Sequence, residues 1–535
     1  MSAWWQQDVI YQIYPRSFMD ANNDGLGDLP GVIQQLDYLA WLGVDAIWFS
    51  PIFPSPLADF GYDVANYTGI HPDYGTLDDF DRLLVEAHSR NLKVILDLVP
   101  NHTSAAHPWF QESRSSRDNP QRDWYIWKDP APDGGPPNNW ISYFGGPAWT
   151  FDQGTRQYYM HNFDPGQPEL NWRNPEVEKV MFDSIRFWLA RGVDGFRIDV
   201  IDRILKDADF RDNPPNPDWK PGDPDIGSLL RVYSEQGEGT HEYMRRFRQV
   251  FDEFPNTVAI GELAYDLSPE QIAAYYGREL DGIGDELHLP FNFGLLMQPW
   301  SADTVRAHVD TYDSAVPAYG WPNYVLSNHD VSRLATRVGI RQARVAAMLL
   351  LTLRGTPTLY YGDEIGMTDA AVPPDRIQDP QGRGGGYNRD ACRTPMQWDA
   401  SPNAGFNNGQ AVPWLPLALN YEQVNVAAQR DEPDSMLMFY RRLLNYRKRT
   451  PALHSGRYYP VEAAPDGCFI YVRQFNDQRR MIVLNLTGKT HSVRLDDNET
   501  GVVAVATRLS REGEQISTGN FTLQPDEGLI IELQA

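Results

Sequence analysis

The sequence has little cysteine, no excess of positive charge and no long apolar run. Its two cysteines, Cys392 and Cys468, are too few for a disulfide framework, and no Cys-x-x-Cys spacing suggests a zinc or redox site. Asp and Glu number 72 against 47 Lys and Arg. The net charge of −25 argues against nucleic acid or an anionic membrane as a partner, since both attract clustered Lys and Arg. The longest apolar run, 345–353, is too short to cross a bilayer, and residues 1–8 lack the basic and apolar regions of a signal peptide. We therefore expect a cytoplasmic protein.

Short strand-like runs alternate with helical patterns through most of the chain, which predicts βα units around a parallel sheet. The helical patterns carry end signals: Asn174-Pro175 is typical of a helix start, and Gly192 of its end. Eight strands with crossing helices predict a (β/α)8 TIM barrel. The predicted strands lie near 9–13, 46–49, 94–97, 196–199, 258–262, 286–289, 324–327 and 358–361.

Two segments depart from this alternation. Residues 103–171 are rich in Pro, Gly, Trp and Asn and are too many for a βα loop, which predicts a subdomain inserted after the third strand, beside the mouth of the barrel. Beyond 455 the helical periodicity stops, and strand-like runs separated by turns predict an antiparallel β-sandwich domain over 456–535. The barrel itself then comprises 1–102 and 172–455.

Acidic residues collect at the predicted carboxyl ends of the strands, where the catalytic groups of such barrels lie. They are Asp97, Asp199, Glu262 and Asp330. Ionised carboxylates at buried strand ends are costly unless they have partners or a task. Ion pairs that support the loops are one interpretation, and it fits Asp97 best.

Glycoside hydrolysis is the other interpretation, because it needs one carboxylate to attack the anomeric carbon and another to protonate the leaving oxygen. Metal chemistry is a rival for the same groups. His102 and His329 are available as ligands, but no His-Glu-x-x-His or comparable spacing supports a catalytic metal. We therefore expect no catalytic cofactor.

Four of these segments, 97–102, 195–199, 261–262 and 327–330, resemble the signature regions of the α-amylase family, glycoside hydrolase family 13. Residues 167–171 resemble the fifth signature of its oligo-1,6-glucosidase and α-glucosidase branch, with Glu169 where the usual form has Asp. The similarity runs essentially end to end and includes Arg393–Trp398. It implies a retaining exo-α-glucosidase that acts on short α-glucosides.

The resemblance also implies roles for individual residues. Asp199 matches the nucleophile, Glu262 the general acid and base, and Asp330 the carboxylate that grips sugar hydroxyls. Arg197, two residues before Asp199, would orient the nucleophile and keep it ionised. The pair Asp59 and Arg389 would close the far side of the first sugar site, which favours exo cleavage. Other implied sugar contacts are Tyr62, His102 and His329, together with Phe144, Phe163 and Gln167, for which packing within the inserted subdomain is an equal alternative.

Val200 and Asp202 bear on specificity. The resemblance links valine directly after the nucleophile to α-1,6 bonds, and Asp202 stands where many relatives have Asn, a change that could reshape the acceptor site. We expect isomaltose-type and maltose-type substrates. A transglucosylase or a sucrose isomerase that forms trehalulose or isomaltulose is the alternative on the same machinery. A non-catalytic interaction subunit is disfavoured, because the three carboxylates are present and no membrane segment is.

Residues 20–28 form an oxygen-rich loop around glycines, a composition that suits a hard cation such as Ca²⁺ or Mg²⁺. The resemblance implies a structural ion there, whereas an Asx-rich turn without metal is the alternative. We expect a monomer or homodimer. The implied ion ligands are Asp20, Asn22, Asp24, Asp28 and the carbonyl of Leu26.

Overall fold

The computed structural model describes residues 3–383, 387–495 and 499–534. Its central sheet has eight strands in the order β11-β8-β7-β3-β2-β1-β13-β12, and every neighbouring pair in this order is parallel. The predicted (β/α)8 barrel is therefore confirmed. Its strands are β1 (Ile10–Ile13), β2 (Ala46–Phe49), β3 (Lys93–Leu98), β7 (Gly195–Ile198), β8 (Val258–Gly261), β11 (Leu289–Pro290), β12 (Asn323–Val325) and β13 (Thr356–Tyr360).

Helices cover the outside of this barrel. The expected start and end signals hold for α5: the Asn174 side chain accepts from the backbone N–H of Glu176, and Gly192 adopts φ 110° at the end. Helix α11 is buried almost all round. The longer helices are α3 (Leu77–Ser89), α5 (Pro175–Arg191), α6 (Thr240–Asp252), α9 (Ala302–Ala315), α11 (Ile340–Thr352) and α14 (Met436–Lys448). Shorter ones include α1 (Leu29–Gln34), α2 (Leu36–Leu42), α8 (Gly294–Met297) and α10 (Leu334–Val338).

The alternation of side chains along the strands places the site. Ile95 and Ile260 belong to a compact cluster inside the barrel, whereas their neighbours Leu96 and Ala259 join the larger core shared with the helices. Because side chains alternate, the residues two positions further along, Asp97 and Glu262, face inward as well. The apolar cluster fills the barrel below them, so the polar groups lie at its carboxyl-terminal mouth.

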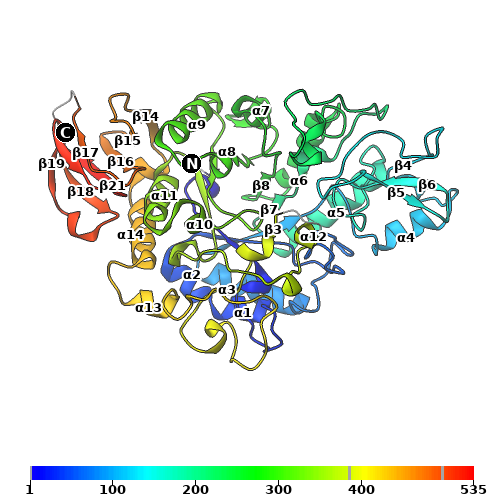
Figure 1. Cartoon of the computed structure of the whole chain (residues 1–535), viewed down its shortest axis with the longest axis horizontal. Helices are drawn as coiled ribbons and strands as arrows, with labels where there is room; N and C mark the ends of the chain where they lie inside the picture. The colour runs from blue at the N-terminus through cyan, green and yellow to red at the C-terminus, as the bar shows by residue number, and fades with distance from the viewer. Residues whose placement is uncertain (1–2, 384–386, 496–498, 535) are drawn as a thin grey trace.

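The inserted subdomain and the C-terminal domain lie at opposite ends of the molecule, with the barrel between them (Figure 1). The insertion contains α4 (Pro108–Ser115) and an antiparallel sheet of β4 (Trp127–Lys128), β6 (Gln157–Met160) and β5 (Trp149–Asp152). The C-terminal region forms two antiparallel sheets, as expected; the boundaries at 103–171 and 456–535 stay predictions. Its strands are β14 (Arg457–Pro460), β15 (Cys468–Phe475), β16 (Gln478–Asn485), β17 (His491–Val493), β18 (Thr500–Ala506), β19 (Gln515–Ser517), β20 (Phe521–Leu523) and β21 (Gly528–Leu533).

Some strand bounds were predicted wrongly. The strand expected over 286–289 is only Leu289–Pro290, because the backbone N–H groups of Glu286 and Leu287 bond to the carbonyls of Tyr276 and Tyr275 instead of a neighbouring strand. Helices long and apolar enough to cross a bilayer are absent from the described parts of the chain.

Candidate active site

A pocket of about 260 Å³ lies at the mouth of the barrel. It receives side chains from the ends of several strands and from the inserted subdomain. The sequence-predicted residues therefore meet in one place, with Arg197 beneath them. Those that line the pocket are Asp59, Tyr62, His102, Phe144, Phe163, Gln167, Asp199, Val200, Glu262, His329, Asp330 and Arg389.

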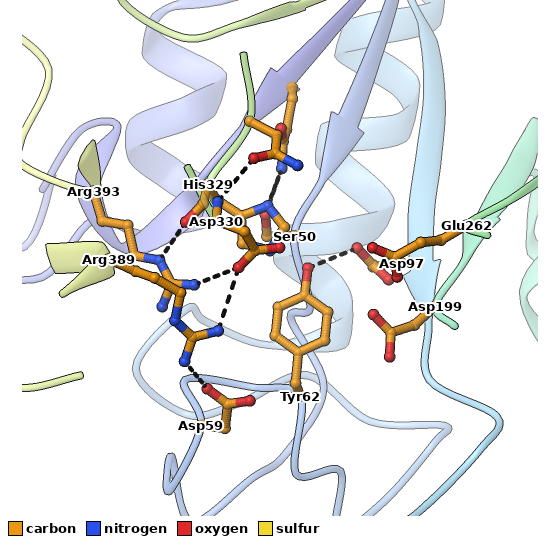
Figure 2. Close-up of polar contacts among 12 residues, drawn as sticks. Ser50, Asp59, Tyr62, Asp97, Asp199, Glu262, His329, Asp330, Arg389 and Arg393 are labelled. Atoms are coloured by element: carbon orange, nitrogen blue, oxygen red, sulfur yellow. Dashed lines mark hydrogen bonds and ion pairs between the residues drawn. The ribbon is translucent and has the colours of Figure 1, made fainter. Parts of the chain in front are cut away.

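Arg197 ties three carboxyl groups together below the pocket. Its Nη1 donates to Asp199 Oδ1 at 2.8 Å and to Asp97 Oδ1 at 2.9 Å, and its Nη2 lies 2.6 Å from Glu262 Oε2. Asp199 and Glu262 directly follow the neighbouring strands β7 and β8, which places them side by side (Figure 2). Two carboxyl groups that bind adjacent nitrogens of one guanidinium are close enough to act on the same bond.

The electrostatics of this cluster favour a retained proton. Burial raises the pKa of Asp199 well above its usual range, and Glu262 and Asp97 raise it further, while the charge of Arg197 opposes them. Burial likewise raises the pKa of Asp97 to about 7. Asp97 and Asp199, two of the three carboxyl groups that share this guanidinium, therefore keep a proton to higher pH than free carboxyl groups do.

Val200 sits in a strained conformation directly after Asp199. Its φ of 37° and ψ of 44° lie in the left-handed region, which a β-branched residue rarely adopts. This turn directs the backbone N–H of Val200 to Glu262 Oε2 at 3.0 Å. This hydrogen bond holds the Glu262 carboxylate beside the residue that follows Asp199.

Asp330 occupies the opposite wall among positive groups. Its Oδ1 lies 3.0 Å from Arg393 Nη2 and 3.3 Å from Arg389 Nη1. Burial acts to raise the pKa of Asp330, but His329 and the two arginines outweigh it and leave the pKa below its ordinary value. Arg389 also pairs with Asp59 at 2.7 Å (Figure 2), and both residues line the pocket.

The two pocket histidines are neutral near pH 7 and become charged only in acid, where His329 acts on Asp330. Burial lowers the pKa of His102 to about 4 and that of His329 to about 3. His102 Nε2 lies 3.0 Å from the carbonyl oxygen of Tyr62, which fixes the imidazole ring. The Tyr62 ring is parallel to that of His329, with centroids 5.3 Å apart, and its hydroxyl donates to Asp97 Oδ2 at 3.1 Å. The site thus offers a flat aromatic surface beside the carboxyl groups.

The residues from the inserted subdomain line the pocket and pack against each other. Phe163 contacts both Phe144 and His102, with ring centroids 5.8 and 5.3 Å apart. The side-chain amide of Gln167 donates to Asp59 Oδ2 at 3.3 Å. The three residues thus pack within the subdomain and also line the pocket, and their contact with the sugar stays a prediction.

Sequence reasoning missed one wall of the pocket. Arg203 lies 3.0 Å from Glu235 Oε2, which also accepts from the Tyr143 hydroxyl at 2.9 Å, and the guanidinium packs 4.0 Å from the centre of the Tyr143 ring. Arg203 lies only four residues after Asp199 in the sequence, and this closeness could have indicated that it lines the pocket. Further lining residues missed are Leu263, Tyr265, Met297, Val331 and Gln381.

Two departures from the signatures lie behind the pocket. Glu169 is buried, pairs with Lys206 and accepts from Asn101 Nδ2 at 2.7 Å. Asp202 is absent from the lining, and its Oδ2 accepts from the backbone N–H of Ala264 at 3.0 Å. Asp202 therefore supports the loop after Glu262 from behind.

The loop at 20–28 is held by hydrogen bonds of its own. Asp20 Oδ1 accepts from the backbone N–H of Asn23 at 2.6 Å and its Oδ2 from that of Gly25 at 2.8 Å, while Asp28 Oδ1 accepts from Gly31 at 2.6 Å. Within residues 3–383, 387–495 and 499–534, no three His, Cys, Asp or Glu side chains are grouped to hold an ion. The structural Ca²⁺ or Mg²⁺ stays a prediction.

Comparisons with known proteins agree with this geometry. Residues 12–456 match the family model described as the α-amylase catalytic domain. The chain is 42% identical to a probable α-glucosidase of Rhizobium meliloti (strain 1021), over 92% of this chain and 91% of that protein. It is 37% identical to an oligo-1,6-glucosidase of Parageobacillus thermoglucosidasius, over 99% of both. The crystal structure of an α-glucosyl transfer enzyme, XgtA, superposes with a TM-score of 0.93 at 40% identity over the whole of both chains.

Proposed function

Because this chain belongs to the α-amylase family, glycoside hydrolase family 13, we propose that it is a retaining exo-α-glucosidase. It releases the non-reducing terminal glucose of short α-glucosides of the isomaltose and maltose type. One observation carries the proposal: Asp199 and Glu262 bind adjacent nitrogens of Arg197 inside one pocket.

The reaction has two steps. Asp199 attacks the anomeric carbon while Glu262 gives a proton to the leaving oxygen, and a covalent glucosyl-enzyme forms on Asp199. Glu262 then takes a proton from water, which displaces Asp199 from the same face that the leaving group occupied. Two inversions at the anomeric carbon give net retention. Asp330 stays ionised beside the ring and favours the positive charge that develops in the transition state.

In the proposed function, the ion pair of Asp59 and Arg389 closes one end of the pocket, which favours exo cleavage. Asp59 and Arg389 are both buried, and Arg389 is further held by Asp379 at 2.7 Å. A chain that continued beyond the first glucose would have to displace this buried pair, which is costly. The pocket thus accepts one terminal glucose, and its hydroxyls meet charged partners.

Transglucosylation is the second candidate function, and the similarity to an α-glucosyl transfer enzyme favours it. Sucrose isomerisation belongs to the same alternative. In each case a sugar hydroxyl, rather than water, reacts with the glucosyl-enzyme. Arg203 and Tyr143 supply polar groups on the wall that an acceptor sugar would face, and Glu235 pairs with both.

Proton NMR of maltose, isomaltose, trehalose and sucrose turnover tests these proposals together. We expect α-glucose as the first anomer released, with maltose or isomaltose as the fastest substrate. Glucose released first as the β-anomer would contradict retention. New glucosides in place of free glucose would establish transfer as the main reaction.

The variant Glu262→Gln tests the acid and base separately. It should slow substrates with poor leaving groups most, and added azide should restore turnover by attacking the glucosyl-enzyme. The expected product is α-glucosyl azide. Formation of the β-azide would remove Glu262 from this role.

We also propose that the loop at 20–28 binds a structural divalent ion through Asp20, Asn22, Asp24, Asp28 and the Leu26 carbonyl. The support is the set of oxygen donors, which suits Ca²⁺ or Mg²⁺. The loop lies beside α1, so an ion there would stabilise the barrel without entering the reaction.

A further inference from the structure

A second hollow, of about 440 Å³, lies beside the active-site pocket. Met297 and Val331 line both hollows, so the two lie on either side of these side chains. Beyond them the hollow runs between α8 with the residues that follow it and α10. Its volume lies within the range of small-ligand sites.

The hollow is an apolar groove with a buried floor and an exposed rim. Leu296 and Leu334 in the floor are each 3% exposed, whereas Met297 on the rim is 54% exposed. Trp300 and Val338 continue the rim and are partly exposed. An exposed, contiguous apolar surface beside a catalytic pocket is typical of a ligand-binding site.

The charged residue in the lining does not make the groove polar. Arg337 Nε donates to the carbonyl of Ser332 at 2.9 Å, and its Nη1 donates to the carbonyl of Leu296 at 3.0 Å. Its guanidinium is therefore engaged with the backbone. Arg203, in contrast, lines the active-site pocket as a charged residue and pairs with Glu235.

We propose that this groove binds an apolar aglycone, an alkyl chain joined to glucose by an α-glucosidic bond. The inference rests on the proposed α-glucosidase function. Asp59 and Arg389 close one end of the pocket, so the group attached to the anomeric oxygen must extend toward the mouth. There the group contacts Met297 and Val331 and can continue over Leu296 and Leu334. An alkyl chain is favoured at this apolar surface because it leaves water there, and a second sugar gains no such stabilisation.

The chemistry is that of the first reaction step. The bond from the anomeric carbon to Asp199 forms as the bond to the alkyl oxygen breaks, and the proton of Glu262 passes to that oxygen, so the chain leaves as a neutral alcohol. Water then releases glucose and returns a proton to Glu262. The groove adds binding free energy for the alcohol portion and changes no reacting group.

Methyl, ethyl, butyl and hexyl α-glucosides separate this binding from the chemistry, because their leaving alcohols have nearly the same acidity. We expect kcat/KM to rise by about three- to fourfold for each methylene that enters the groove. In Val338→Asp, which places a charge on the rim of the groove, the ratio of the hexyl to the methyl substrate should fall well below the wild-type ratio. In Val85→Asp, on the exposed face of α3, the ratio should stay at the wild-type value.

Equal kcat/KM for all four alkyl glucosides would overturn the proposal that the groove binds the alkyl chain, provided that maltose or isomaltose is hydrolysed. A wild-type hexyl-to-methyl ratio in Val338→Asp would also overturn it. If no α-glucoside of either kind releases glucose, the proposed α-glucosidase function itself fails, and the groove proposal fails with it. Turnover of the methyl substrate reports in each variant that the protein is folded.

Discussion

Replacing Arg197 with glutamine removes the cation that three buried carboxyl groups share. The hydrogen bond that Arg197 donates to Asp199 is 2.8 Å long and charge-assisted, and a bond of this type contributes about 1.5–3 kcal/mol. If this contact is lost in the transition state, kcat/KM should fall by about 10- to 150-fold. Removing one partner of a buried ion pair should also destabilise the fold by about 3–5 kcal/mol.

The pH dependence of kcat/KM distinguishes a loss of charge beside Asp199 from a general loss of folded protein. Arg197 holds down the pKa of Asp199, so without it that pKa rises further and the nucleophile becomes protonated at higher pH. The acid limb of kcat/KM should therefore move to higher pH in Arg197→Gln and less in Arg197→Lys. Arg191→Gln, which breaks the partly exposed pair with Asp81, is the control and should leave the profile unchanged. An acid limb at the wild-type position in Arg197→Gln would refute the reasoning.

Three further changes test other parts of the site. Asp199→Asn should lower turnover by about 10³-fold or more with little effect on thermal unfolding; substantial activity would remove Asp199 from the nucleophile role. Burial raises the pKa of Asp202 to about 7, so its charged form destabilises the fold increasingly as pH rises from the ordinary value toward 7. Asp202→Asn should consequently raise the melting temperature more at pH 8 than at pH 5, and an equal rise at both would contradict a raised pKa. A chelator should lower the melting temperature and added Ca²⁺ restore it, whereas a chelator without effect would reject the ion at 20–28.

The sequence predicted the barrel well because its strands alternate with strongly patterned helices. Asp199 and Glu262 could be predicted because each directly follows a strand and alternation turns it toward the mouth. The lining residues Tyr143, Arg203 and Met297 could not be predicted, since they come from separate segments of the chain that meet only through tertiary packing.

Local rules also failed at particular backbone positions. The strand expected at 286–289 is shortened by hydrogen bonds to Tyr275 and Tyr276, which no propensity indicates. The left-handed conformation of Val200 contradicts the preference of a β-branched residue. It is held there by its place between Asp199 and Glu262, where the surrounding structure outweighs the local cost.

The decisive measurement is to locate the glucose on the enzyme during turnover. In Glu262→Gln, α-glucosyl fluoride needs no acid to leave, and without the base the glucosyl-enzyme should accumulate. After acid quenching and proteolysis, mass spectrometry should find one glucosyl residue on the peptide that contains Asp199, at that side chain. Glucose attached at Asp97, Asp330 or another residue would contradict the assignment of Asp199 as the nucleophile.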